Sequence, residues 1–329
     1  MGCRRSENRG ARPATPRRNL AMPSDVLDAL KRSAAIPSLP QVVTRFLEVI
    51  RDPDFDFDAV ADVLAADPGM TGDILRLVNS PLFGMTRKVS SLHQGLTLLG
   101  LRRVRSLVLG RYLVDSMGGT NMGGVDASYF WRRSLATAVM TAKFVDARLP
   151  AVRDEAFIGG LLCDTGVIVM AEAMTAYAPV AKKYAPHQEE DICAAEALAV
   201  GMDHCQVSAA VLEHWQLPEI VTEAVALHHA TEIPSDTSEE VSTVARSLRG
   251  AGSIGKLLCE TTDAKPAVDI CRQAMDRVGL DLSVLARCLD EVESEIRDLA
   301  DVLRIDIIPS KVYGMLAAEL SKELAQPVG

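Results

Sequence analysis

The feature of this sequence that most restricts its fold is a succession of helix start signals, each followed by an apolar stripe of helical period. Asp67, followed by proline, reads as an N-cap residue that opens the segment GMTGDILRLVN. Ser38 with Gln41 and Ser91 with Gln94 have the spacing of a capping box. We find no strand-like alternation of useful length, and aromatic residues, which favour strands, make up only 4% of the chain. The sequence therefore predicts an all-α protein.

The charge of the chain is distributed unevenly. The formal net charge is −9, yet residues 1–22 contain six arginines and a single acidic residue. An acidic body argues against nucleic acid or an anionic membrane as the main partner. No uninterrupted apolar run reaches the roughly 18 residues of a membrane span, and the first 22 residues lack the apolar core of a secretory signal. The seven cysteines form no CxxC pair, so we expect reduced thiols in a cytoplasmic protein.

Breaks in the pattern divide the chain into five predicted segments. Residues 1–23 are expected to be a basic, disordered arm, and residues 24–117 an N-terminal helical subdomain. The glycine-rich stretch GGTNMGG, residues 118–124, reads as a linker. A helical bundle should follow over residues 125–235. After the polar stretch PSDTSEE, residues 236–329 are expected to form a helical C-terminal extension.

The stretch DPGMTGDILRLVNSPLFG, followed by SSLHQGLTLLGLRRVR, resembles the HDOD family, and the likeness extends over roughly residues 30–250. This family is related to the HD metal-dependent phosphohydrolases. The resemblance implies an HD-like helical bundle, in which histidines and aspartates from several helices converge on one or two metal ions. It also implies a role in bacterial signalling networks.

The resemblance places seven residues at a vestigial HD pocket. Two ligand histidines of the family pattern are replaced here, one by arginine and one by the cysteine of a Cys-Asp pair, and its last aspartate falls on a second arginine. A guanidinium offers only hydrogen-bond donors and cannot coordinate a cation. We therefore expect no metal, no cofactor and no catalytic residue at this pocket. Its residues are Arg133, Cys163, Asp164, His204, His228, His229 and Arg246.

Two residues at the middle of the chain, Cys163 and Asp164, invite closer inspection. Thr165 and Gly166 read as a helix stop, so Asp164 should meet the negative end of a helix dipole and require a partner. We expect an ion pair with Arg133 or with the second arginine of the pocket. A helix C-terminus disfavours a reactive thiolate, so Cys163 is interpreted as a small core residue, with a regulatory thiol as the alternative.

The function that follows is that of a non-catalytic, HDOD-type regulatory protein, a pseudoenzyme in signal transduction. Its expected partners are signalling proteins, with a nucleotide second messenger as a further ligand, and neither nucleic acid nor a membrane span is expected. One alternative is a metal-dependent phosphohydrolase acting on nucleotides or cyclic dinucleotides, which requires a bound metal. The other is a sensor that holds an anionic nucleotide in the vestigial pocket, where Arg133 and Arg246 would suit phosphate geometry.

Overall fold

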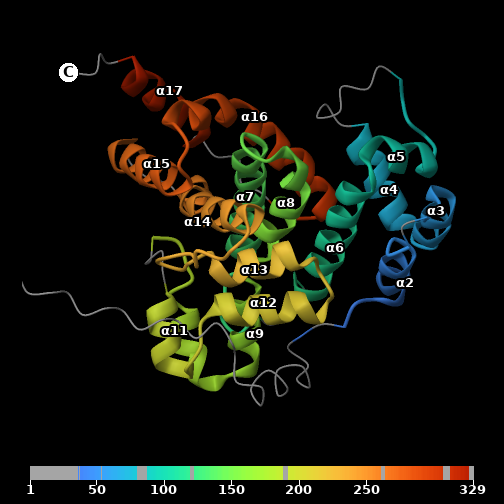
Figure 1. Cartoon of the computed structure of the whole chain (residues 1–329), viewed down its shortest axis with the longest axis horizontal. Helices are drawn as coiled ribbons and strands as arrows, with labels where there is room; N and C mark the ends of the chain where they lie inside the picture. Colours follow the sequence, from blue (N-terminus) through green and yellow to red (C-terminus); the bar gives the residue numbers. More distant parts are fainter. Residues whose placement is uncertain are drawn as a thin grey trace, which may run out of the picture.

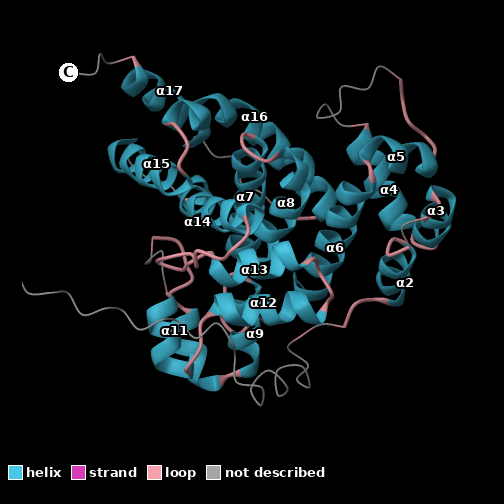
Figure 2. Ribbon diagram, in the orientation of Figure 1, coloured by secondary structure: helices cyan, strands magenta, loops and turns pink. Residues whose placement is uncertain are grey.

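The chain is helical throughout the part that its computed structural model describes (Figure 1). Figure 2 shows helices joined by loops, with no strand in the described residues. This confirms the predicted all-α class. The predicted arm, residues 1–23, and the middle of the predicted linker lie outside the described residues. The described residues are 36, 38–52, 54–79, 87–118, 122–187, 192–260, 264–306 and 312–325.

Four short helices form a lobe at one end of the molecule, and a long helix leads from it to the rest of the chain (Figure 1). The four are α2 (Gln41–Val49), α3 (Phe57–Ala65), α4 (Pro68–Val78) and α5 (Leu92–Leu99), and the long helix is α6 (Leu101–Gly118). Each short helix buries one apolar stripe against its neighbours. The lobe thus follows from the amphipathic pattern of the sequence.

The helix start signals predict where a helix begins better than which side chain forms the capping hydrogen bond. Asp67 caps α4 by accepting a backbone N–H bond of 3.0 Å from its first turn, as predicted. Helix α5 begins directly after Ser91, but that side chain makes no capping bond. The predicted capping box at Ser38 is wrong, because α2 begins at Gln41 after Pro40. A residue that precedes a proline is disfavoured in helical conformation, which delays the start of the helix.

The centre of the molecule is a bundle built around α7 (Ala127–Asp146), which is buried along most of its length. Helices α8 (Arg153–Leu162) and α9 (Thr165–Ala173) follow it in the chain, and α12 (His204–His214) and α13 (Glu219–Leu227) complete the bundle. The helix predicted near residues 167–184 is interrupted after α9. The short elements between these helices are η2 (Pro150–Val152), η3 (Thr175–Tyr177), α10 (Ala178–Ala181) and α11 (Cys193–Val200).

The C-terminal part of the chain adds helices to the same core. Helix α14 (Glu239–Cys259) packs along α7, and α15 (Ala264–Val278) packs on α14. Helix α16 (Leu282–Leu303) contacts both α4 and α7, and α17 (Val312–Leu324) packs on α15 and α16. Buried apolar residues of all these parts form one continuous cluster. The predicted segment boundaries remain a prediction.

Two glycines set how closely the bundle helices approach around Asp164. A Cβ on Gly160 of α8 would lie 2.6 Å from the Cα of Ala138 on α7. A Cβ on Gly166 of α9 would lie 2.5 Å from the carbonyl oxygen of His204 on α12. Both distances are shorter than van der Waals contact, so only glycine allows these backbones to meet. Asp164 is held between these two contacts.

One segment of the bundle has the length and composition of a membrane span. It runs from Pro150 to Ala173 and comprises η2, α8 and α9. The sequence analysis did not single out this segment. In the structure, 83% of its most apolar window is buried among the other helices.

Candidate functional site

Charged and polar side chains from several helices meet inside the bundle. Arg133 comes from α7, Asp164 from the junction of α8 and α9, His204 from the first position of α12, and His228 from the C-terminal end of α13. All four side chains are buried. His229, beside His228, is half-buried. The structure thus brings together six of the seven residues predicted for the pocket, Cys163 included.

Asp164 lies just after the C-terminal end of α8, as predicted, and it is also the residue that precedes α9. Thr165 begins α9 and does not stop α8, and its hydroxyl donates a 2.8 Å hydrogen bond to the carbonyl of Leu162. Asp164 therefore occupies the N-cap position of α9, although its side chain makes no capping bond. A carboxylate at a helix N-terminus is next to the positive end of the dipole. The predicted helix end is thus present at Leu162, but the prediction missed that a second helix begins at Thr165 and brings a favourable dipole to Asp164.

The carboxylate of Asp164 is only 6% exposed and is approached from both of its oxygens. The hydroxyl of Tyr184 donates a 2.6 Å hydrogen bond to Oδ2, and Nη2 of Arg133 lies 3.7 Å from the same oxygen. On the other side, Nε2 of His204 and Nε2 of His228 each lie 3.6 Å from Oδ1. The expected Asp164–arginine ion pair is thus present, and Arg133 supplies it.

These neighbours keep Asp164 ionised in spite of its burial. Burial by itself raises the pKa of a carboxyl, but Arg133, His228 and His204 together outweigh it and hold the pKa of Asp164 well below its usual range. The guanidinium of Arg133 also lies over the ring of Tyr184, 4.6 Å from its centroid. Burial raises the pKa of Tyr184 well above its usual value, so its hydroxyl remains a donor.

A second buried carboxylate holds the far side of His204. Glu196 on α11 is 0% exposed, and its Oε2 lies 2.7 Å from Nδ1 of His204. The hydroxyl of Tyr177 donates a 2.7 Å hydrogen bond to the other oxygen of Glu196. Burial by itself lowers the pKa of a histidine, but Glu196 and Cys193 together outweigh it and raise the pKa of His204 well above its usual value. His204 is therefore an imidazolium between two carboxylates.

The buried charges of the cluster balance. Two carboxylates, Asp164 and Glu196, face two cations, Arg133 and His204, and each carboxylate also accepts a tyrosine hydroxyl. Taking a charge out of water costs several kcal/mol unless it is paired and hydrogen-bonded. The arrangement meets this condition without any further ion.

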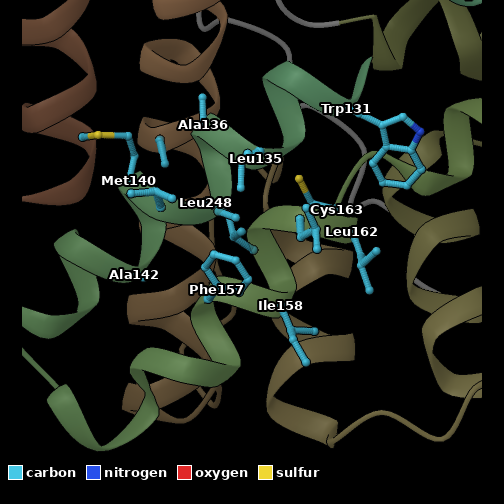
Figure 3. Close-up of a cluster of buried hydrophobic side chains, with 14 of the residues drawn as sticks. Trp131, Leu135, Ala136, Met140, Ala142, Phe157, Ile158, Leu162, Cys163 and Leu248 are labelled. Atoms are coloured by element: carbon cyan, nitrogen blue, oxygen red, sulfur yellow. The ribbon is translucent and has the colours of Figure 1, made fainter. Parts of the chain in front are cut away.

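Cys163 fills space next to this cluster. Figure 3 shows its side chain among apolar residues that include Leu162 and Leu248. It is 4% exposed, and burial together with Asp164 raises the pKa of its thiol well above the usual value. A protonated, enclosed thiol is a poor nucleophile. This agrees with the interpretation of Cys163 as a core residue.

The second predicted arginine is not part of the cluster. Arg246 is exposed on α14, so its assignment to the pocket is wrong. Arg249, one helical turn later, lines the pocket instead and donates a 2.9 Å hydrogen bond to the carbonyl of Ala230. Arg246 and Arg249 lie one helical turn apart, but only Arg249 is on the side of α14 that faces the pocket.

The cavity at the cluster is small. Its volume is about 10 Å³, and Arg133, Asp164, His228, His229 and Arg249 are among its lining residues. A space of roughly 10–15 Å³ holds one water molecule. A nucleotide does not fit into this cavity in the present conformation.

The metal that the HD relationship implies does not fit the residues at this pocket. Two groups of residues, Cys163 with Asp164 and His228, and His204 with His228 and His229, do bring potential ligand atoms within 4.8 Å of one another. However, the guanidinium of Arg133 already lies against Asp164, and the hydroxyl of Tyr184 occupies the same oxygen. A divalent cation bound to this carboxylate would face a fixed positive charge at close range. We therefore assign no metal-dependent step to this pocket.

Asp203, the residue before His204, has a structural role. Asp203 caps α12 in a complete capping box with Gln206. This cap fixes the start of the helix and places His204 at its first position. The residues that sequence reasoning missed are Tyr184, Glu196 and Arg249. A tyrosine or glutamate in a helical region carries no local pattern that would indicate a partner in a distant helix.

Comparisons with known proteins agree with the observed fold. The model of the HDOD domain family matches residues 36–231, which is more than half of the chain. An uncharacterized protein from Treponema pallidum (strain Nichols) is 26% identical over 215 residues, covering 64% of this chain and 41% of that protein. The chain thus spans less than half the length of this curated relative.

Two solved structures are similar over most of both chains. An HDOD domain protein of unknown function from Geobacter sulfurreducens superimposes with a TM-score of 0.61 at 22% identity, covering 87% of this chain and 99% of that one. A proposed phosphohydrolase from Shewanella amazonensis SB2B gives a TM-score of 0.63 at 22% identity, covering 84% and 97%. At these identities the likeness establishes the fold.

Proposed function

The chain belongs to the HDOD family, and we propose that within this family it is a non-catalytic regulatory protein that acts in signal transduction through protein partners. The relationship of this family to HD phosphohydrolases is compatible with two roles of the pocket, catalysis or stabilisation of the fold. The groups that surround the retained aspartate favour the second role.

The observation that carries this proposal is the position of Arg133. Its guanidinium approaches the carboxylate that would bind the metal of an HD enzyme. Metal-assisted hydrolysis depends on a cation that polarises a phosphoryl group and activates water. A guanidinium neither coordinates water for activation nor accepts a proton near neutral pH. Arg133 therefore compensates the charge of Asp164, but it cannot activate water as a metal ion does.

The same pair explains why Asp164 is retained. Through its two oxygens, this carboxylate connects α7, the α8–α9 junction, α12, α13 and the Tyr184 segment. Loss of one partner from a buried ion pair costs about 3–5 kcal/mol, because the remaining charge is left uncompensated. We propose that the cluster fixes the relative positions of these helices and thereby the surface that partners recognise.

The size of the cavity argues against binding of a nucleotide in the pocket. A nucleotide pocket requires several hundred Å³, whereas this cavity measures about 10 Å³. Arg249, which could otherwise contact phosphate, donates to the carbonyl of Ala230. The cluster is thus an enclosed part of the fold.

The proposal is tested by assaying the full chain for hydrolysis of a phosphodiester and of cyclic dinucleotides with added Mg²⁺, Mn²⁺ or Fe²⁺. The matched control is Asp164→Asn, which keeps the shape of the side chain and removes its charge. We expect wild-type phosphate release to be no greater than that of the variant. Metal-dependent release by the wild type that disappears in Asp164→Asn would show that the protein is an enzyme.

A further inference from the structure

Two thiols and an imidazole come together at the edge of the charge cluster. The Sγ atoms of Cys193 and Cys205 lie 3.8 Å apart. Sγ of Cys193 lies 3.8 Å from Nδ1 of His204, and Sγ of Cys205 lies 3.9 Å from Nε2 of the same ring. With one ring nitrogen counted, all three ligand atoms lie within 4.8 Å of one another, and all three residues are buried.

The local structure holds these groups in place. Cys193 is the first residue of α11, and Cys205 is the second residue of α12. The turn between the two helices passes through Gly201 in left-handed conformation, and the capping box of Asp203 fixes the start of α12. Both thiols thus come from the first turn of a helix, and burial raises the pKa of the Cys205 thiol well above its usual value.

We propose that Cys193, Cys205 and His204 bind a thiophilic d10 cation, Cu⁺ or Zn²⁺. Thiolate and imidazole are the ligands that these ions prefer. With metal–sulfur bonds of about 2.3 Å, two thiolates at a tetrahedral angle lie about 3.8 Å apart, which is the separation found here. Binding displaces the protons of both thiols and of the ligating ring nitrogen, and these protons leave to solvent.

Glu196 provides a second and independent observation. It is fully buried, and its Oε2 lies 2.7 Å from Nδ1 of His204. Metal-ligating histidines nearly always donate the proton of one ring nitrogen to a carboxylate or carbonyl, which directs the other nitrogen at the ion. Here the carboxylate accepts from Nδ1, and this leaves Nε2, 3.9 Å from Sγ of Cys205, as the free ring nitrogen for the ion. The hydroxyl of Tyr177 and the backbone N–H of His204 hold Glu196 in this orientation.

The proposed site is separate from the HD pocket. Neither cysteine nor Glu196 lines the cavity beside Arg133, and neither thiol corresponds to a metal ligand of the HD pattern. The two locations share only His204, whose Nε2 also lies 3.6 Å from Asp164. A metal bound at the thiols would therefore break the contact between His204 and Asp164, whereas the ion pair between Arg133 and Asp164 would remain. This inference does not depend on whether the protein is catalytic.

The test is a titration of the full chain, reduced and kept free of oxygen, in two arms. In the first, Co²⁺ serves as a spectroscopic substitute for Zn²⁺. We expect a thiolate-to-cobalt charge-transfer band that saturates at one Co²⁺ per chain and is removed by Zn²⁺. In the second, Cu⁺ is supplied from a chromophoric chelator, and we expect one Cu⁺ to be withdrawn per chain. If only one of the two titrations saturates at one ion per chain, that titration identifies the ion that the site binds.

Cysteine variants locate the bound ion. Cys193→Ser and Cys205→Ser should each weaken binding at least tenfold, whereas Cys271→Ser, which removes a buried thiol of α15, should leave binding unchanged. Wild-type protein that gives no charge-transfer band and withdraws no Cu⁺ would overturn the proposal, whatever the variants do. Binding retained in both Cys193→Ser and Cys205→Ser would overturn it as well.

Discussion

Nη2 of Arg133 lies 3.7 Å from Oδ2 of Asp164, and both side chains are more than nine-tenths buried. In an HD phosphohydrolase the corresponding carboxylate would bind a metal ion. In this protein the carboxylate is compensated by one of the protein's own side chains. The predictions below follow from this relationship and from the packing that encloses it.

Removing Arg133 should destabilise the fold. Arg133→Met retains much of the side-chain volume but leaves Asp164 as a buried anion with weaker compensation. We expect the free energy of unfolding to fall by about 3–5 kcal/mol, measured by urea denaturation. The control is Arg246→Met on the exposed side of α14, for which we expect a change within about 0.5 kcal/mol. Equal losses in the two variants would mean that the buried pair adds nothing.

Packing between α7 and α8 should not tolerate a methyl group at Gly160. A Cβ there would lie 2.6 Å from the Cα of Ala138, so the backbones must move apart. We expect Gly160→Ala to cost about 1–3 kcal/mol or more. Gly72→Ala on α4 is the control, because no atom lies within 4 Å of its added Cβ. That change should be neutral or slightly stabilising, and a similar loss at both positions would contradict the close approach.

Acid should weaken the cap of α4. A hydrogen bond from the hydroxyl of Tyr112 lowers the pKa of Asp67 below its usual value. A carboxylate with a lowered pKa in the folded state stabilises the protein above its ordinary pKa, near 3.9, and loses this contribution as the pH falls through the folded value. Asp67→Asn retains a capping side chain without the charge.

Urea unfolding curves of wild type and Asp67→Asn should therefore differ near neutral pH and approach one another below about pH 4. Tyr112→Phe removes the hydrogen bond that lowers the pKa of Asp67. In this background, the free energies of unfolding with Asp and with Asn at position 67 should therefore differ less. A difference that stays constant from pH 7 to pH 3 would show that the ionised form of Asp67 contributes no stability.

Much of the fold could be predicted from the sequence because helix signals are local. Asp67 and the proline after it define the start of α4 within a few residues, and the structure agrees. Exceptions arise where a neighbouring residue overrides the signal, as Pro40 does at the start of α2. Likewise Thr165 continues the chain into α9, because its hydroxyl bonds back to Leu162 and Gly166 packs against α12.

The site could be predicted only in part because its contacts join distant segments. The family resemblance identified Arg133 on α7 and Asp164 at the junction of α8 and α9. It could not identify Tyr184 or Glu196, whose roles depend on where α10 and α11 fold back. The error at Arg246 has the same origin, because the sequence alone does not say which turn of α14 faces the pocket.

The central claim is that Arg133 and Asp164 compensate one another inside the bundle. A double-mutant cycle measures this directly, with Arg133→Met, Asp164→Asn and the double variant compared with wild type by urea denaturation. We predict that the double variant is more stable than the sum of the single losses implies, with a coupling energy of about 1–3 kcal/mol. Single losses that add to within about 0.5 kcal/mol would contradict the claim.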